Sequence, residues 1–358
     1  MNKNFWKNKK VFITGNNGFK GGWLSLWLKN LGADVQGYSL EPNYSPYFYS
    51  ATNMNRLIKT TRGDIRDYEK IKKAILKFHP DIVFHMAAQP IVRRSFSEPL
   101  ETFSTNIMGT CNILHALKFS QNIKVFINIT SDKCYENKEW LWGYRESDRL
   151  GGSDPYSNSK ACSELITSSF KNSFYNDVAI STARAGNVIG GGDWSVDRLI
   201  PDFIRSIIEK KKLVIRNPNS IRPWQHVLSP LSGYIILAEK MFTNPNKYSG
   251  AWNFGPQICD IKNVEYVIKK ISTFFDLNNF YKIQKIKSSM HEAKYLMLDS
   301  SKAISFLAWK NVLDLDKSID MTAKWYEAYF NKNNMLDFSI AQIEKFSLLY
   351  NSKKNNDK

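Results

Sequence analysis

Hydroxyl and ionisable side chains cluster directly after the apolar run VFINI at residues 125–129. The cluster consists of Thr130, Ser131, Asp132 and Lys133. An acid beside a base could pass protons to and from a substrate if both were held at one site. The same residue types also occur where strands simply stop, because Ser, Thr and Asp bond their own backbone in turns and caps. The rest of the chain decides between these interpretations.

A tyrosine and a lysine four residues apart are the second candidate for proton chemistry. Tyr156 and Lys160, in the stretch DPYSNSK, would lie on one face of a helix, one turn apart. A phenol titrates near pH 10, so it needs help to act as a base near neutrality, and a neighbouring ammonium supplies that help by favouring the phenolate. Such pairs are common on helix surfaces, so this spacing gains meaning only together with the other motifs.

Strand and helix patterns alternate through the first half of the chain. The patterns predict strands within 10–15, 34–40, 81–89, 125–129 and 177–190, and helices within 19–32, 67–80, 99–120 and 154–174. Strands separated by helices of this length form a parallel sheet covered on both faces. We therefore expect the α/β class, with a doubly wound parallel sheet of Rossmann type and a smaller, mixed α/β substrate-binding lobe.

The pattern changes after about residue 190, where loops carry Arg, Pro and aromatic residues. Loops of this kind often build a pocket on a rigid scaffold. We expect a dinucleotide-binding domain in residues 1–185, with segments returning from the second half. An interleaved substrate-binding lobe is expected in 186–340, and a partly disordered polar tail in 341–358.

A glycine-rich turn, TGNNGFKG, connects the first predicted strand to the first predicted helix. It places Gly15, Gly18 and Gly21 where the amino end of a helix would point free N–H groups at a phosphate. Glycines there permit a tight turn and a close approach of the backbone. The spacing G-x-x-G-x-x-G differs from the commoner G-x-G-x-x-G, yet its strand–turn–helix context indicates a dinucleotide site.

The end of the second strand normally carries an acid that binds the ribose of NAD. Ser39 occupies that place here, and no Arg beside it would welcome the 2′-phosphate of NADP. The choice between the two cofactors stays open on local chemistry, although NAD is favoured. Asp64 and Ile65, in GDIRD, are candidates for contacting adenine, with a turn and a helix cap at Asp67 as the equally simple alternative.

The order of glycine turn, strand-end hydroxyl and Tyr–Lys pair resembles the extended short-chain dehydrogenase/reductase superfamily. The likeness covers nearly the whole chain, and one branch, the CDP-glucose 4,6-dehydratases, is especially similar. The motifs that carry it are TGNNGFKGGWLSLWL, HMAAQPIVRRSF, TNIMGT, TSDKCYEN, DPYSNSKACSE, ARAGNVIGGGDW, DRLIPD and RPWQHVLSPLSGY. The resemblance implies a lyase that oxidises carbon 4 of a sugar, eliminates water across carbons 5 and 6, and returns the hydride to carbon 6. Such products usually feed the deoxysugars of surface polysaccharides such as O-antigen.

Elimination explains why an acid and a base would stand together at a strand end. By resemblance, Tyr156 is the base at the carbon 4 hydroxyl, Ser131 holds that oxygen, and Lys160 tunes Tyr156. Asp132 is then the acid at carbon 6. Most sugar-nucleotide dehydratases carry Glu at the position of Lys133. A lysine at this position matches the CDP-glucose branch. Lys133 would be the base at carbon 5 if its surroundings favour the neutral amine, or would stabilise the enolate if it stays charged.

The resemblance also implies two sets of binding residues. The residues expected to bind the cofactor are Gly15, Asn17, Gly18, Phe19, Gly21, Ser39, Asp64, Ile65, Ala87, Ala88, Gln89, Asn106, Thr130, Tyr156 and Lys160. Those expected to bind the nucleotide sugar are Gln89, Arg94, Asn187, Arg198, Leu199, Arg222 and His226. Arginines suit a diphosphate because they can bind it in bidentate fashion. The preference for a cytosine base rests on the resemblance alone.

Composition narrows the class of protein. The net charge of +17 is spread along the 358 residues rather than gathered in a patch, so it fits an anionic small substrate better than nucleic acid. No apolar stretch suggests a membrane span or a signal peptide. The four cysteines lack metal or disulfide spacing, and no metal site is expected. We expect a cytoplasmic homodimer or homotetramer, since relatives pair the helices near 97–119 and 155–175.

Two other functions remain open from the sequence. One is a 4-epimerase, or a dehydratase of another NDP-hexose or NDP-heptose, on the same fold. The other is a cofactor-binding regulatory or nucleic-acid-binding protein without catalysis, against which the intact Asp132, Tyr156 and Lys160 argue.

Overall fold

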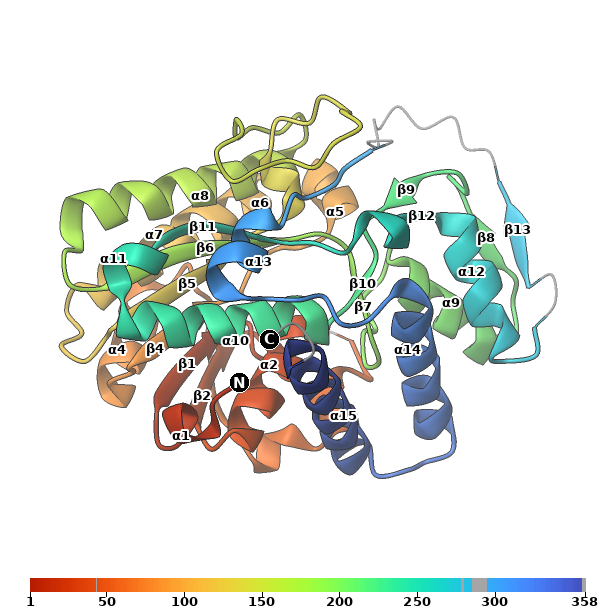
Figure 1. The fold of residues 1–358 in the computed structure, drawn as a ribbon, viewed down its shortest axis with the longest axis horizontal. Helices are drawn as coiled ribbons and strands as arrows, with labels where there is room; N and C mark the ends of the chain where they lie inside the picture. The colour runs from red at the N-terminus through yellow and green to blue at the C-terminus, as the bar shows by residue number, and fades with distance from the viewer. Residues whose placement is uncertain (43, 278–279, 285–294, 356–358) are drawn as a thin grey trace.

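A seven-stranded parallel sheet forms the centre of the computed structural model, which describes residues 1–42, 44–277, 280–284 and 295–355. The strand order is β11-β6-β5-β4-β1-β2-β3, and Figure 1 labels all of these strands except β3. Their bounds are β1 Lys10–Thr14, β2 Asp34–Ser39, β3 Lys59–Arg62, β4 Ile82–His85, β5 Val125–Ile129, β6 Ala179–Ala185 and β11 Gly250–Phe254. This topology confirms the expected doubly wound α/β fold.

The central strands are apolar on both faces, as strands covered on two sides must be. Along β1, Val11 and Ile13 face one apolar cluster, whereas Phe12 faces the other. The first cluster lies under α2 (Phe19–Asn30) and α10 (Leu228–Thr243), and the second lies under α4 (Tyr68–Phe78), α7 (Gly109–Leu117) and α8 (Pro155–Phe174). Helices thus cover both faces of the sheet.

Strand register brings the candidate site residues to one edge. Thr14 at the end of β1 pairs with His85 at the end of β4, and His85 pairs with Asn128 of β5. Since all these strands are parallel, the segments that follow them emerge side by side. The glycine turn and the Ser131–Lys133 segment, which forms the single turn η3 (Asp132–Cys134), therefore lie at the same carboxyl edge.

Two helices of the sheet layers begin at well-formed caps. Asp67 accepts a hydrogen bond from the Lys70 N–H at the start of α4, and Asp154 accepts one from the Ser157 N–H at the start of α8. Such side-chain caps satisfy N–H groups that the helix leaves free. The helix expected over 99–120 is a run of α6 (Pro99–Phe103), a π-helical turn η2 (Ser104–Met108) and α7.

The second half of the chain builds a smaller lobe, seen to the right in Figure 1, from short paired strands and helices. Its elements are β7 Val188–Ile189, α9 Leu199–Ile208, β8 Leu213–Ile215, β9 Ile221–Arg222, β10 Gln225–His226, η4 Ile258–Asp260, β12 Lys262–Asn263, α12 Val264–Thr273, β13 Tyr281–Ile283 and α14 Leu315–Phe330. Between these, α10 and β11 return to the main sheet, so the two lobes are interleaved along the chain.

The expectation of a partly disordered tail is wrong for residues 341–355. Helix α15 runs from Met335 to Asn355, and its Ile343, Phe346 and Tyr350 are buried in the main core. Phe346 packs edge-on against Trp27 of α2, with ring centroids 5.5 Å apart. The remaining short helices are α1 Lys3–Trp6, α3 Phe48–Ala51, η1 Met54–Arg56, α5 Val92–Ser97, α11 Pro245–Tyr248 and α13 Ser301–Leu307. Within the described ranges, no helix is long and apolar enough to cross a membrane.

Candidate active site

The glycine turn forms a cradle at the carboxyl end of β1. Gly15 has a φ of +72°, and a side chain there would approach the Ala87 backbone nitrogen to 2.6 Å. A side chain at Gly21 would collide with the Gly15 carbonyl, and Gly18 is the N-cap of α2 without any side chain to occupy the free N–H groups. The twelve-residue helix therefore presents its amino end to an open backbone cradle, which suits a dinucleotide phosphate.

The polar residues around this cradle bind one another. The Ser39 hydroxyl donates to Asn16 Oδ1 at 2.9 Å and accepts from the Asn17 N–H at 3.2 Å. The Asp64 carboxylate is bound by the Arg66 guanidinium, which lowers the pKa of Asp64. Ser39 and Asn17 thus line the turn itself, whereas the carboxylate of Asp64 already has a cationic partner.

Asn106 fixes the segment that follows β4. Asn106 accepts the Gln89 N–H at 2.8 Å and donates to the Gln89 carbonyl at 3.1 Å and the Ser159 hydroxyl at 2.9 Å. The Gln89 side chain is also occupied, because it bonds the Thr102 hydroxyl and the Ile91 backbone. In this structure both residues fix the loop that carries Ala87 and Ala88 beside the glycine turn.

The structure brings the five predicted catalytic residues together. Ser131 caps the turn after β5: its hydroxyl accepts the Lys133 N–H at 3.2 Å and donates to Asp132 Oδ1 at 3.0 Å. The Lys133 ammonium lies 3.7 Å from the same oxygen. Asp132 is only 1% exposed, and its second oxygen, Oδ2, has no hydrogen-bond partner within the described part of the chain. A buried carboxylate with one open oxygen is suited to proton transfer with a bound substrate.

Tyr156 and Lys160 face this turn from α8. Burial raises the pKa of Tyr156 to about 12, opposed first by its hydrogen bond with Ser131. Burial also lowers the pKa of Lys160 to about 8, opposed by the charge of Glu164. The Lys160 ammonium donates to the Ile129 carbonyl at 3.4 Å, at the very end of β5. With this raised pKa Tyr156 is neutral near pH 7, so its ionisation there would need a nearby positive charge.

Lys20 is a residue of this site that the sequence analysis missed. Its ammonium donates to the Tyr234 hydroxyl at 3.0 Å. Its pKa is lowered to about 7, chiefly by burial and then by the charges of Lys160 and Arg198, whereas Asp132 acts in the opposite sense. The signal was present in the turn GFKG, where a lysine in the first turn of α2 must lie near the strand edge.

The predicted substrate residues are not all at the site. Arg198 precedes Leu199 at the start of α9 and pairs with Asp193 at 3.2 Å, close enough to act electrostatically on Lys20 and Tyr156. Arg94 is exposed and pairs with Glu101 at 2.7 Å. Its neighbour Arg93 instead reaches Asp197, at 3.3 Å, on the loop next to Arg198. Of the two arginines, Arg93 is the one that faces the substrate loops.

The stretch RPWQHV divides between the lobe and the core. Arg222 is buried and donates to the Ile221 carbonyl at 2.8 Å, and Asn187 accepts the Gln225 N–H through its carbonyl at 3.2 Å. His226 is 0% exposed, accepts the Leu228 N–H at 3.3 Å and lies edge-on to Trp23. Its ring is enclosed and its Nε2 has no hydrogen-bond partner among the described residues, so a role for His226 at the substrate stays a prediction.

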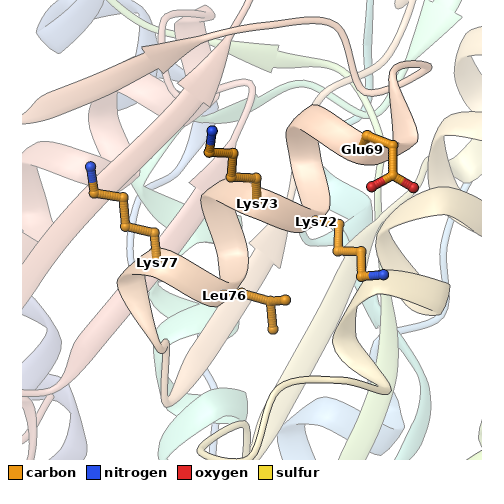
Figure 2. Close-up of a pocket in the computed structure, with 5 residues that line it drawn as sticks. All are labelled: Glu69, Lys72, Lys73, Leu76 and Lys77. Atoms are coloured by element: carbon orange, nitrogen blue, oxygen red, sulfur yellow. The ribbon is translucent and has the colours of Figure 1, made fainter.

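The groove in Figure 2 lies elsewhere, along a single exposed helix. It is lined by Glu69, Lys72, Lys73, Leu76 and Lys77, all from α4. Lys72 packs its ammonium over the Phe119 ring at 4.3 Å. These lysines are a solvated helix face rather than a built pocket. Across the described residues, no group of His, Cys, Asp and Glu could hold a metal ion.

A glycine cradle at the first strand and a Ser–Tyr–Lys group at the same sheet edge define an enzyme of the short-chain dehydrogenase/reductase type. The chain belongs to the GDP-mannose 4,6 dehydratase family, whose sequence profile matches residues 12–322. It is 49% identical to the CDP-glucose 4,6-dehydratase of Salmonella typhimurium over 97% of this chain and 98% of that relative. These matches confirm the resemblance that the motifs indicated.

Solved structures share the fold at lower identity. The dTDP-glucose 4,6-dehydratase of Bacillus anthracis, in complex with NAD, superposes with a TM-score of 0.74 at 20% identity, covering 89% of this chain and 96% of that one. The UDP-glucuronic acid 4-epimerase of Bacillus cereus, with UDP-glucuronic acid and NAD, gives a TM-score of 0.77 at 22% identity and covers 89% and 99%. Dehydratases and epimerases therefore share this scaffold, and the residues at the strand edge must distinguish them.

Proposed function

We propose that this chain is a lyase that converts CDP-glucose to CDP-4-keto-6-deoxyglucose. The observation that carries the proposal is the buried Asp132 with an open oxygen, next to Lys133 and Ser131. A 4-epimerase needs no acid and base beyond its Tyr–Lys pair, whereas an elimination needs both. The 49% identity to the Salmonella CDP-glucose 4,6-dehydratase supports the same reaction and the cytidine base.

The oxidation at carbon 4 falls to residues of β5 and α8. Tyr156 removes the proton of the carbon 4 hydroxyl, while Ser131, hydrogen-bonded to Tyr156, holds the same oxygen. Lys160 supplies the positive charge that favours the phenolate. Bound NAD would supply a nicotinamide that can take up the carbon 4 hydride and later give it to carbon 6. The cradle of Gly15, Gly18 and the α2 amino end fits its diphosphate, and the relatives solved with NAD support this cofactor.

The elimination falls to the turn after β5. The ketone at carbon 4 makes the carbon 5 hydrogen acidic, and Lys133, as the neutral amine, takes that hydrogen as a proton. Asp132, protonated at the start of this step, donates its proton to the departing carbon 6 hydroxyl through Oδ2, while Ser131 holds Oδ1. The step leaves Asp132 as the carboxylate and Lys133 as the ammonium, the pair of charges that lies 3.7 Å apart in the structure. The placement of Arg198 and Arg222 on the substrate lobe suits them to the diphosphate of the sugar nucleotide, with Asn187 and Leu199 beside it.

The assembly and location are proposed on separate grounds. Apolar residues are exposed on helices that pack together, namely Leu100 on α6 (84% exposed), Met108 on η2 and Leu165 on α8. Covering such a face by a second copy is the usual solution, so we expect a homodimer or homotetramer. Light scattering after gel filtration measures this directly. Four free cysteines fit the reducing cytoplasm.

Mass spectrometry tests the reaction most directly. The protein is incubated with NAD and, separately, CDP-, dTDP-, UDP- and GDP-glucose, and the CDP-glucose carries deuterium at carbon 4. The expected result is loss of one water from CDP-glucose alone, with the label retained at carbon 6.

Other outcomes would identify a different substrate, a different reaction or a protein without this activity. Water loss from a different nucleotide sugar would keep the mechanism and replace the substrate. An unchanged mass with a changed sugar configuration would identify an epimerase. Absence of both, with NAD bound, would leave a cofactor-binding protein without this chemistry.

The product class would supply deoxysugars for surface polysaccharides such as O-antigen.

A further inference from the structure

A buried ion pair behind the active site is not used by the mechanism above. Glu164 of α8 and Arg184 of β6 are each 3% exposed and join through two hydrogen bonds of 2.8 and 3.0 Å. The Glu164 carboxylate also accepts the hydroxyls of Thr182, at 2.6 Å, and Thr130. Buried ion pairs often stabilise a fold no better than packed apolar residues do. A fully bonded pair at this place therefore points to a role beyond stability.

Glu164 and Lys160, both on α8, bind adjacent residues at the catalytic strand end. Thr130 directly precedes Ser131, and its hydroxyl is held by Glu164. Ile129 directly precedes Thr130, and its carbonyl accepts from Lys160, which lies one helical turn before Glu164 on α8. Glu164 and Lys160 are consequently hydrogen-bonded to two adjacent residues, Thr130 and Ile129. We propose that Glu164 is a positioning residue of the active site, whose carboxylate fixes the Thr130 end of β5 and keeps the neighbouring Lys160 cationic.

The charges around Lys160 support this role. The Lys160 ammonium faces Lys20 from α2, His85 from β4 and Cys134 from η3, besides Glu164 on its own helix. His85 has its pKa lowered to about 3, and the buried Cys134 has its thiol pKa raised, so neither carries charge near neutrality. Lys20, when protonated, repels Lys160. The opposing negative charge therefore comes first from Glu164.

The sign of the pH effect follows from these charges. Lys160 supports the Tyr156 phenolate only while it is protonated, so activity should fall as pH rises through the pKa of Lys160, about 8. Removing the Glu164 charge lowers that pKa further, which moves the alkaline limb of the rate profile to lower pH. An opposite charge at short range typically moves a pKa by about one unit or more.

The experiment compares Glu164→Gln with Thr182→Val in the full-length protein. Both changes remove hydrogen bonding at the same carboxylate, but only the first removes its charge. Two readouts are used: the pH profile of dehydration, and the titration of Lys160 by carbon-13 NMR of protein labelled at lysine Cε, with Lys160→Met giving the assignment. Glu164→Gln should lower the pKa of Lys160 and the alkaline limit of the pH profile by about one pH unit each. On the alkaline side this corresponds to about a tenfold lower rate. Thr182→Val should leave both in place, and Glu164→Asp, which keeps the charge, should lie close to the parent.

The NMR titration needs no substrate, which separates this inference from the proposed function on which it rests. A parent protein that dehydrates no nucleotide sugar would overturn the function alone. An unshifted Lys160 titration in folded Glu164→Gln would overturn the inference alone. Should Glu164→Gln fail to fold because Arg184 is left buried and unpaired, the double variant E164Q/R184Q removes both charges. It should show a downward shift smaller than that of Glu164→Gln, because the Arg184 charge lost with it is opposite in sign to that of Glu164, and an unshifted Lys160 would again overturn the inference.

Discussion

The Ser131 hydroxyl donates to Asp132 Oδ1 at 3.0 Å, while Asp132 Oδ2 is buried with no partner among the residues described. One oxygen is thereby fixed and the other is left open towards Gly186, where an added Cβ would lie 2.9 Å away. The carboxylate is held in one orientation without being saturated. The two oxygens therefore have separate roles: Oδ1 aligns the acid, and Oδ2 remains for the reaction.

Asp132→Asn tests that separation. The amide keeps the shape of the side chain and can still accept from Ser131, but it cannot deliver a proton. We expect loss of water to slow by about 10²–10⁴-fold, whereas oxidation at carbon 4 continues. Reduced nicotinamide should therefore accumulate and be visible by its absorbance in a single turnover. An equal loss of oxidation and elimination would contradict a role for Asp132 at carbon 6 only.

Lys133 is tested by two substitutions that differ in charge. Lys133→Met removes the amine, and Lys133→Arg keeps a positive charge but cannot act as a base, because a guanidinium stays protonated in proteins. If Lys133 takes the carbon 5 proton, both variants should lose exchange of that hydrogen with deuterated solvent by about 10²-fold or more. Retained activity in the arginine variant alone would show that the charge, which stabilises the enolate, is what matters.

Lys20 should weaken the binding of oxidised cofactor in particular. The nicotinamide ring is cationic in NAD and neutral in NADH, so a nearby ammonium repels only the first. We expect Lys20→Met to tighten NAD by about fivefold to tenfold while changing NADH little, as measured by calorimetry. Because the pKa of Lys20 is about 7, the parent protein should bind NAD more tightly as pH rises through that value, and the variant should not. Equal changes for both cofactors would point to space, or to an attraction between Lys20 and the diphosphate that both forms share, rather than to the charge of the ring.

Helix α15 should stabilise the whole fold. Phe346→Ala removes a buried ring that packs on Trp27, and such changes cost about 3–5 kcal/mol in the free energy of unfolding. Chemical denaturation measures this loss. Leu348→Ala on the same helix is the control, since Leu348 is 71% exposed and its replacement should cost little. If both variants unfold like the parent, α15 does not contribute to the core.

The sheet and the site edge could be predicted because they follow from local rules. Alternating strand and helix patterns fix a parallel sheet, and the glycine turn fixes which edge binds the dinucleotide. Ser131, Asp132 and Lys133 come to that edge simply because they follow β5. The resemblance then supplied their chemistry.

The failures concern side-chain direction, which spacing does not determine. Arg93 and Arg94 are adjacent on α5, so they point to different sides, and only the tertiary fold shows that Arg93 faces Asp197. The polar end of the chain hid α15, although its buried residues Ile343, Phe346 and Tyr350 recur at helical spacing.

The return of β11 to the sheet constrains how the chain can be synthesised. β11 pairs with β6 through Gly250 opposite Ser181 to Phe254 opposite Ala185, so the edge of β6 stays open until most of the chain has left the ribosome. An open strand edge invites pairing with other chains. This protein should therefore depend most on chaperones, and aggregate most readily, while the nascent chain still ends before Gly250.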